Sequence, residues 1–169
     1  MLILQKINII KHNINMLKIE DFKKKLDKKS RLMGIDPGKK RVGIAISDEN
    51  KIIATPYTTI IKNDYSTFLN KLKKIFNDND IKGIIVGNPI NMDGSSSRSS
   101  QSARDLAINL SKDITENITM WDERLSSQGA FNLTSNLNTN TTKKVKKLDE
   151  NAAQFILQGA LDYITKENT

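Results

Sequence analysis

Short apolar runs bounded by turn residues begin at Leu32 and indicate β-strands. The segments RLMGIDPG, RVGIAISD and KIIATPYTTI lie at residues 31–38, 41–48 and 51–60. Because only short turns rich in Gly, Lys, Asp and Asn separate them, they predict three successive antiparallel strands. The segment KGIIVG at residues 82–87 has no polar alternation, which is typical of a fully buried strand. We expect a fifth strand at ITMWDE.

Helical spacing of apolar positions predicts helices between and after these strands. Residues 64–79 place several large apolar side chains on one face, and a second helix is expected at about residues 101–113. The segments SSQGAFNLTSNL and LDENAAQFILQGALDYI predict two final helices, with a polar and basic stretch at residues 138–147 between them. Earlier in the chain, residues 18–29 have three apolar side chains at helical spacing, so we expect a short helix leading into the domain.

This order of elements predicts an α/β domain with a mixed five-stranded sheet and helices on both faces. Three antiparallel strands come first, and two parallel strands follow. A chain of 169 residues with 37% apolar residues is large enough for one hydrophobic core, with little left for a second. We therefore expect one domain at residues 31–169 and a basic N-terminal extension, with its short helix, at residues 1–30.

The absence of cysteine restricts the chemistry of the chain. It excludes disulfides, cysteine-ligated zinc, iron–sulfur clusters and thiol nucleophiles. The only histidine, His12, lies in the lysine-rich N-terminal stretch, so the predicted domain has no imidazole for a serine–histidine triad or a histidine-built metal site. Any catalysis must use carboxylates, hydroxyls, lysines or a metal held by oxygen ligands.

The formal net charge of +8 indicates an anionic partner, but the charge is unevenly distributed. Residues 1–33 carry nine Lys or Arg against three Asp or Glu, whereas residues 34–169 carry eighteen against sixteen. The predicted domain is therefore nearly neutral. No apolar run approaches the roughly eighteen residues of a membrane span, and the N-terminal segment lacks the small-residue cleavage site of a secretory signal. We expect neither a membrane anchor nor secretion.

Acidic residues stand where the predicted elements end or begin. Asp36 ends the first strand, Asp122 and Glu123 end the last strand, and Asp149 begins the final helix. Because ligands gather at the carboxyl ends of the central strands in such sheets, we expect these side chains to converge. Packed carboxylates repel one another and need a cation, and oxygen ligands favour Mg²⁺ or Mn²⁺. A pair of such ions can clamp a reacting phosphodiester, so the cluster predicts a nuclease centre.

Each acidic position also has a purely structural interpretation. An Asp before Pro-Gly, as at Asp36, often stabilises a turn through backbone N–H groups. Asp122 and Glu123 could cap a following helix, and acids at Asp149 would favour a helix dipole. Three caps at the ends of converging elements are less expected by chance than one. We therefore favour the metal-binding interpretation over the capping interpretation.

Two polar segments could hold substrate phosphates. The loop NMDGSSSR at residues 91–98 has the composition of a flexible linker, but its place after the central strand would bring hydroxyls, backbone N–H groups and Arg98 near Asp36. Both interpretations carry equal weight. The run that contains Lys143 and Lys144 is by default a solvated segment, but beside Asp149 it would bind backbone phosphates.

The few aromatic residues bear on the kind of nucleic acid. Trp121 lies on a strand whose neighbours face the core, so we expect it to pack in the core rather than stack on a base. Only nine of 169 residues are aromatic, which gives little support to recognition of single strands by stacking. Structured RNA or branched DNA, held by contacts to its backbone, fits better.

Four segments resemble, in order, the signature blocks of the YqgF/RuvX family of Holliday-junction-resolvase-like proteins. They are IDPGKKRVGIAISD, IIVGNPINMDGSSSRSS, WDERLSS and KKLDENAAQFILQGALDYI, and together they cover about residues 32–165. The resemblance implies a ribonuclease H-like fold and a cytoplasmic bacterial protein or its organellar descendant. It also implies a nuclease that matures the 5′ end of pre-16S ribosomal RNA. The older family description is a Holliday-junction resolvase, which shares the chemistry but cleaves DNA.

The resemblance also assigns roles to residues. Asp36 matches the first-strand acid, Glu123 or Asp122 the acid of the DER block, and Asp149 the acid of the last helix. All four are candidate catalytic residues, and Asp36, Glu123 and Asp149 are the candidate Mg²⁺ or Mn²⁺ ligands. The candidate substrate-binding residues are basic: Lys39, Arg98, Arg124, Lys143 and Lys144.

The chain departs from the family pattern in three places. The turn Pro37-Gly38-Lys39 is more basic than usual, and the family generally lacks the first thirty residues. Where the parent resolvases have a further acid after the central strand, this chain has Gly87-Asn88-Pro89. Fewer acidic ligands favour a second hypothesis, a non-catalytic module that binds nucleic acid or assembling ribosomes. A homodimer, as in the family, is also an open alternative.

Overall fold

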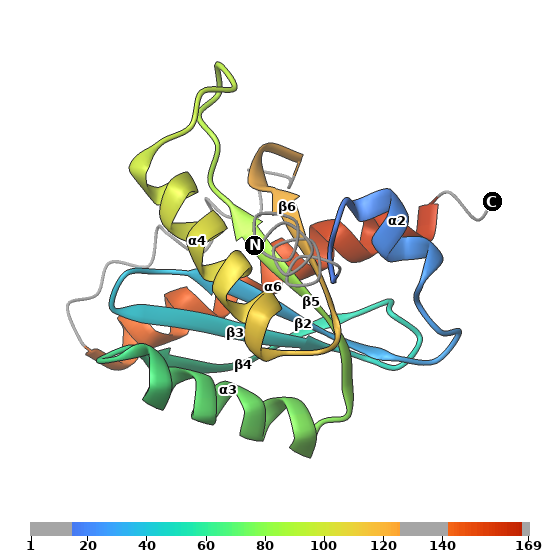
Figure 1. The fold of residues 1–169 in the computed structure, drawn as a ribbon, viewed down its shortest axis with the longest axis horizontal. Coiled ribbons are helices and arrows are strands. Elements are labelled where there is room, and N and C mark those ends of the chain that lie inside the picture. The colour runs from blue at the N-terminus through green and yellow to red at the C-terminus, as the bar shows by residue number, and fades with distance from the viewer. Residues whose placement is uncertain (1–14, 126–141, 167–169) are drawn as a thin grey trace, which may run out of the picture.

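A six-stranded mixed sheet forms the centre of the protein in the computed structural model, which describes residues 15–125 and 142–166 (Figure 1). The strand order is β1-β6-β5-β2-β3-β4. The strands are β1 (Met16–Leu17), β2 (Arg31–Pro37), β3 (Arg41–Ser47), β4 (Ala54–Ile61), β5 (Ile81–Asn88) and β6 (Asn117–Asp122).

The pairing confirms the predicted mixed sheet. Strands β2, β3 and β4 form an antiparallel meander, and β5 and β6 run parallel to β2. In this register Asp36 lies opposite Gly43 of β3, and Asn88 of β5 lies opposite Asp122 of β6. The carboxyl ends of β2, β5 and β6 therefore meet at one end of the sheet.

Four α-helices and one 3₁₀ turn surround the sheet in the described part of the chain. They are α2 (Ile19–Lys24), α3 (Tyr65–Asp78), α4 (Arg98–Asp113), η1 (Glu123–Leu125) and α6 (Thr142–Lys166). The Asp64 carboxylate caps α3 by accepting from the Thr67 N–H at 2.8 Å, and the Ser97 hydroxyl caps α4 by accepting from the Ser100 N–H at 3.1 Å. The cap at Ser97 explains why α4 begins before the predicted start at residue 101.

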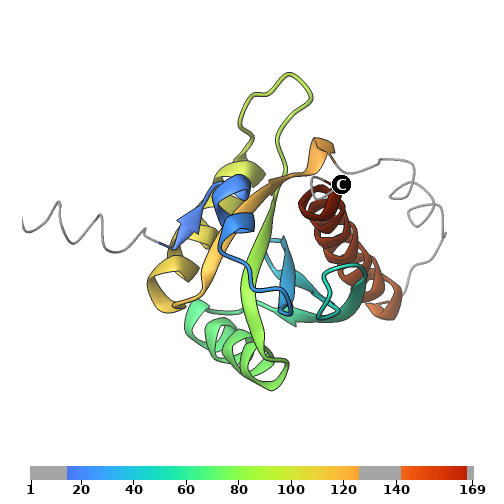
Figure 2. The same cartoon turned by 90° about the vertical axis from the view of Figure 1, so that its right-hand side faces the viewer.

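The two faces of the sheet pack against different helices, as Figure 2 shows. Alternation along the strands sends Ile35 and Val86 toward α3 and α4, and sends Ile85 and Trp121 toward α6. The Trp121 side chain is 2% exposed, and its ring lies 5.6 Å from that of Tyr163. This confirms the prediction that Trp121 belongs to the core.

Part of the predicted N-terminal extension belongs to the packed structure. Strand β1 pairs in parallel with β6, and Phe22 of α2 is fully buried against Gly83 of β5. The predicted boundary after residue 30 therefore falls inside the packed structure rather than at its edge. The sheet has six strands instead of the predicted five because it includes β1. This strand contains only two residues, which are too few to produce a periodic pattern in the sequence.

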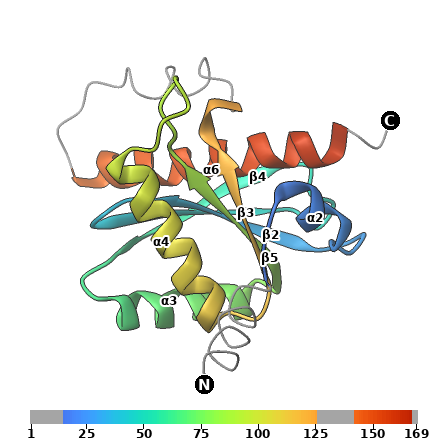
Figure 3. The same cartoon turned by 45° about the horizontal axis from the view of Figure 1, so that its top comes forward.

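The last helix begins earlier than predicted. Helix α6 starts at Thr142, so the basic stretch up to residue 147 forms its first turns instead of a linker. Lysine is a good helix former, but this stretch has no apolar periodicity that would have indicated a helix. The predicted helix at residues 126–137 lies outside the described residues. Figure 3 shows α6 running along the sheet, with the loop after β5 and the end of β6 projecting from the same end of the molecule.

Within residues 15–125 and 142–166, none of the helices combines the length and the apolar character that crossing a membrane requires.

Candidate active site

Asp36 points to the face of the sheet that α6 covers. Two residues earlier on β2, a Cβ added at Gly34 would lie 2.6 Å from the Cβ of Leu157 in α6. Because alternate residues of a strand share a face, Asp36 lies on this same side. Helix α6 also approaches β3 closely at Gly43, where an added Cβ would overlap the carbonyl oxygen of Asp149. Since Gly43 pairs with Asp36, the Asp149 backbone lies next to Asp36.

Glu123 joins Asp36 and Asp149 on this face. It follows Trp121 by two residues, and an added Cβ at Gly87 would lie 2.6 Å from its Oε1 atom. The carboxylate of Glu123 therefore covers the end of β5. Asp122 alternates to the opposite face, toward α4. Strand alternation thus places one acid of the Asp-Glu-Arg segment beside Asp36 and keeps the other acid away.

Burial and mutual repulsion act strongly on two of these carboxyl groups. Burial, followed by the charge of Asp149, raises the pKa of Asp36 to about 6. Burial, followed by the charges of Asp36 and Asp122, raises the pKa of Glu123 to about 7. Both groups therefore carry unfavourable negative charge near neutral pH, and a bound cation would relieve it.

The other two acids, Asp149 and Asp122, form ion pairs with arginine side chains. Nε of Arg41 donates to Oδ2 of Asp149 at 2.7 Å. Hydrogen bonds from Arg124 are the main cause that lowers the pKa of Asp122. The same hydrogen bonds, with the charges of Asp122 and Asp93, raise the pKa of Arg124. Sequence reasoning missed Arg41, although its position directly after the Pro-Gly-Lys-Lys turn could have indicated that it lies near Asp36.

The side chains fit a divalent cation in their chemistry but are not assembled as a complete site. Carboxylate oxygens are the ligands that Mg²⁺ and Mn²⁺ prefer, and Asp36 and Glu123 repel each other in a buried setting. Among the described residues, however, no group of three acidic or histidine side chains is close enough to hold a metal ion. Binding by Asp36, Glu123 and Asp149 therefore remains a prediction, in which the metal would compete with Arg41 for Oδ2 of Asp149.

The predicted substrate-binding residues are spread around this end of the sheet. Lys39 is exposed in the turn between β2 and β3, and Arg98 is exposed at the first residue of α4. Arg124 lies beside the loop after β5, because an added Cβ at Gly94 would be 3.6 Å from its Nη1 atom. Lys143 and Lys144 lie in the first turn of α6, but their side chains are outside the described part of the structure.

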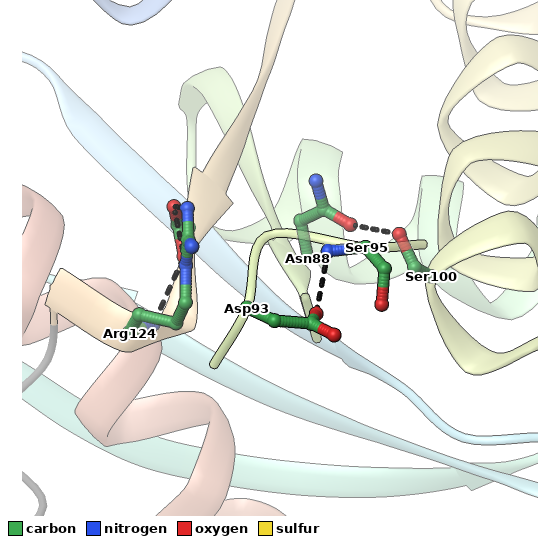
Figure 4. Close-up of polar contacts among 6 residues, drawn as sticks. Asn88, Asp93, Ser95, Ser100 and Arg124 are labelled. Carbon is green, nitrogen blue, oxygen red and sulfur yellow. Dashed lines mark hydrogen bonds and ion pairs between the residues drawn. The ribbon is translucent and has the colours of Figure 1, made fainter. Parts of the chain in front are cut away.

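The loop at residues 89–97 has defined internal contacts. Ile90 and Ser96 form an isolated β-bridge, and Oδ1 of Asp93 accepts from the Ser95 N–H at 2.8 Å. At its base, Oδ1 of the buried Asn88 accepts from the Ser100 hydroxyl at 2.8 Å (Figure 4). This buried hydrogen bond, which sequence reasoning also missed, ties the end of β5 to α4.

Comparisons of the sequence with known proteins show to which family this chain belongs. The profile of the RuvX family, described as Holliday junction resolvase, matches residues 30–163. A protein of Pelagibacter ubique (strain HTCC1062) named "Putative pre-16S rRNA nuclease" is 54% identical over 149 residues, which cover 88% of this chain and 99% of that protein. A protein of the same name from Ruegeria sp. (strain TM1040) is 41% identical and covers 85% of this chain and 91% of its own length.

A solved structure confirms the predicted fold. RuvC of T. thermophilus, in complex with a Holliday junction substrate, superposes with a TM-score of 0.50 at 9% identity. The match covers 79% of this chain and 94% of RuvC. At this low identity the likeness establishes the ribonuclease H-like fold and nothing further. The match over residues 30–163, together with the identity to two relatives over most of their length, shows that the chain belongs to the RuvX family.

Proposed function

We propose that this protein is a metal-dependent nuclease that hydrolyses phosphodiester bonds, with the 5′ end of pre-16S ribosomal RNA as its substrate. The observation that carries the proposal is the pair of buried carboxyl groups of Asp36 and Glu123, whose pKa values are raised to about 6 and about 7. Such a pair destabilises the folded protein near neutral pH unless a cation binds there. Buried carboxyl groups with strongly raised pKa values are typical of a functional site.

Each acidic or basic residue of the candidate site would have a definite role in this reaction. Asp36 and Glu123 would hold Mg²⁺ or Mn²⁺, with Asp149 as a further oxygen ligand. The bound metal would supply an activated water and charge stabilisation for the scissile phosphate. Arg41, once released from Asp149, would remain near the incoming phosphate as a positive charge. Lys39, Arg98 and the basic first turn of α6 would bind backbone phosphates around the carboxylates and so orient the substrate.

The names of the relatives support RNA as the substrate, because the two similar proteins described above are named as pre-16S rRNA nucleases. The family description and the RuvC complex favour the second candidate, cleavage of a Holliday junction. The third candidate is binding without cleavage. The Arg41 and Arg124 ion pairs favour it, since they occupy two of the four acids.

One experiment separates these candidates. Purified protein is incubated with a pre-16S RNA fragment that carries the 5′ precursor, a four-way DNA junction, and plain RNA and DNA duplexes, each with Mn²⁺, Mg²⁺ or EDTA. We expect metal-dependent cleavage of the precursor RNA. Asp36→Asn should abolish it while the melting temperature stays unchanged or rises, because the amide keeps the shape but loses the charge. Cleavage of the junction alone would establish the resolvase, and binding without cleavage in every metal would overturn the nuclease proposal.

Location and oligomeric state follow from the same proposal. A nuclease for ribosomal RNA precursors would act in the cytoplasm or in an organelle derived from a bacterium. A homodimer would place two sets of carboxylates on one substrate, which suits the junction better than the RNA end. Light scattering of the purified protein, with and without each nucleic acid, measures whether the dimer forms.

A further inference from the structure

Asp122 holds Arg124 in a single orientation. Nε of Arg124 donates to the two carboxylate oxygens of Asp122 at 3.0 and 3.1 Å, and Nη2 donates to Oδ2 at 2.6 Å. The backbone N–H of Arg124 donates to Oδ1 at 3.0 Å. Both oxygens of Asp122 are therefore occupied by the residue two positions later. The bidentate arrangement is the geometry in which a carboxylate orients a guanidinium most firmly.

The remaining edge of the guanidinium is directed at the loop after β5. Its Nη1 atom is the nearest atom to a Cβ added at Gly94, at 3.6 Å. Gly94 has a φ of +84°, so the loop turns sharply at this point. The Arg124 side chain is 34% exposed, and the charge of Asp93 in the loop acts on it. A ligand approaching between the end of β6 and the loop would therefore meet the Nη1 edge.

The position next to Asp122 in the sheet, Asn88 of β5, carries no second acid, and the other acid whose charge acts on Arg124 is Asp93 of the loop. Asn88 pairs with Asp122 in the parallel register of β5 and β6, and its Oδ1 atom accepts from the Ser100 hydroxyl. Between them, Asn88 and Asp122 offer a metal one amide oxygen and one carboxylate, both already engaged. The absence of an acid at position 88 weakens this face as a metal site, and it also makes the face less repulsive to a phosphate.

We propose that Asp122 is a positioning residue and that Arg124, oriented by it, binds a backbone phosphate on the α4 side of the sheet end. This phosphate is different from the one at Asp36 and Glu123, because alternation places those carboxylates on the α6 side. The inference rests on the proposed function and deepens it. Guanidinium N–H groups bind phosphate oxygens well, and the carboxylate that orients them does so without contacting the substrate.

The test measures RNA binding and metal binding separately, so that neither depends on cleavage. Fluorescence anisotropy in EDTA gives the affinity for a 20-base-pair RNA duplex, and calorimetry gives the affinity for Mn²⁺. Arg124→Ala and Asp122→Ala should each weaken RNA binding about tenfold, and Arg124→Ala should reduce the slope of log affinity against log salt by about one. Mn²⁺ affinity should change less than about twofold, whereas loss of a metal ligand in Asp36→Asn should cost at least about tenfold.

A comparison of single and double variants tests whether Asp122 affects RNA binding through Arg124. If Asp122 acts through Arg124, the Asp122→Ala substitution should add nothing in an Arg124→Ala background. Arg31→Ala is the matched control, because Arg31 also pairs with an acid, Glu49, but lies at the opposite end of β2. It should not change RNA affinity. Asp122→Asn, which keeps the acceptor for the backbone N–H, replaces Asp122→Ala if the latter unfolds.

Three results would overturn the inference. They are a tenfold loss of Mn²⁺ affinity in Asp122→Ala, a further loss of RNA affinity in the double variant, and an unchanged salt slope in Arg124→Ala. A failure of the proposed function looks different. In that case the wild-type protein cleaves none of the substrates with either metal, while RNA affinity and its salt slope still report on Arg124.

Discussion

The carboxylate of Glu123 lies directly over Gly87, and a Cβ at that glycine would be 2.6 Å from Oε1 and 2.5 Å from Cδ1 of Ile156. Real Cβ atoms essentially never show such distances, so a Cβ at position 87 would require the ends of the Glu123 and Ile156 side chains to move. The relationship connects the central strand, the turn after β6 and helix α6 at one point. It also shows that the position of the acid depends on the residue it covers.

Gly87→Ala should therefore impair the candidate site specifically. We expect a loss of about 1 to 3 kcal/mol in the free energy of unfolding from overpacking, together with weaker Mn²⁺ binding because Glu123 is displaced. Gly34→Ala is the matched control, since its Cβ would meet Leu157 and the Ala153 carbonyl but no acid. It should destabilise the protein without a comparable change in Mn²⁺ affinity. Calorimetry and urea unfolding of both variants measure the difference, and equal Mn²⁺ affinities would contradict the prediction.

The raised pKa values predict that the metal-free protein loses stability as the pH rises from about 4 to about 7. In the folded state Asp36 titrates at about 6 and Glu123 at about 7, above their ordinary values of 3.8 and 4.5. The folded protein therefore binds these protons more tightly than the unfolded chain, and this stabilising contribution is lost as pH rises through the folded pKa values. One pKa unit corresponds to about 1.4 kcal/mol, so each carboxyl contributes on the order of 3 kcal/mol at most.

Urea unfolding in EDTA at pH 4.5, 6 and 7.5 tests this dependence. The double variant Asp36→Asn with Glu123→Gln should show a flatter profile, and it should be more stable than the wild type at pH 7.5. Added Mn²⁺ should restore the stability of the wild type at pH 7.5 but not change that of the double variant. If the stability of the wild type depends on pH as little as that of the variant, the pKa values of the two carboxyl groups are not raised in the folded protein.

Arg41→Ala should increase the affinity for Mn²⁺. Arg41 competes with a metal for Asp149 through a 2.7 Å ion pair, but its side chain is 50% exposed, so the pair is worth no more than about 1 kcal/mol. The expected gain is therefore up to about fivefold at low salt and less at high salt. Arg31→Ala, which breaks an ion pair with Glu49 at the far end of β2, should leave the affinity unchanged. A Mn²⁺ affinity that does not rise in Arg41→Ala would contradict the competition between Arg41 and the metal for Asp149.

Phe22→Ala should destabilise the whole domain. The side chain is fully buried and lies against Gly83 of β5, so its removal should cost about 3 to 5 kcal/mol. The exposed Lys24 on the same helix gives the control variant Lys24→Ala, which should lose less than about 0.5 kcal/mol. A chain that starts at residue 31 should likewise melt at a much lower temperature than the full chain. If it melts at the same temperature, residues 16–30 are an appendage after all.

The sequence by itself determined the elements and the chemistry they carry. Short apolar runs bounded by turn residues located β2 to β6 to within a few residues, because buried strands are short and apolar and the turns between them are polar. The placement of Asp36, Asp122 and Glu123 at the end of a strand was likewise visible along the chain, whereas Asp149, expected at the start of the last helix, lies inside α6 because the helix begins at Thr142. The rule that parallel strands end together predicted that Asp36 and Glu123 lie near each other, and the charge of Asp36 does act on Glu123. The absence of cysteine and the single histidine limited the chemistry to oxygen ligands.

Only the tertiary structure decided which of these acids can act together. Alternation separates Asp122 from Glu123, but the face that carries Asp36 is known only once α6 packs on Gly34 and Gly43. The Arg41–Asp149 ion pair joins residues 108 positions apart, and the pairing of β1 with β6 joins residues 102 positions apart. Neither leaves a local pattern, because contacts between distant segments depend on how whole elements pack. The electrostatics of the site depends on that packing as well, since burial is the largest cause of both raised pKa values.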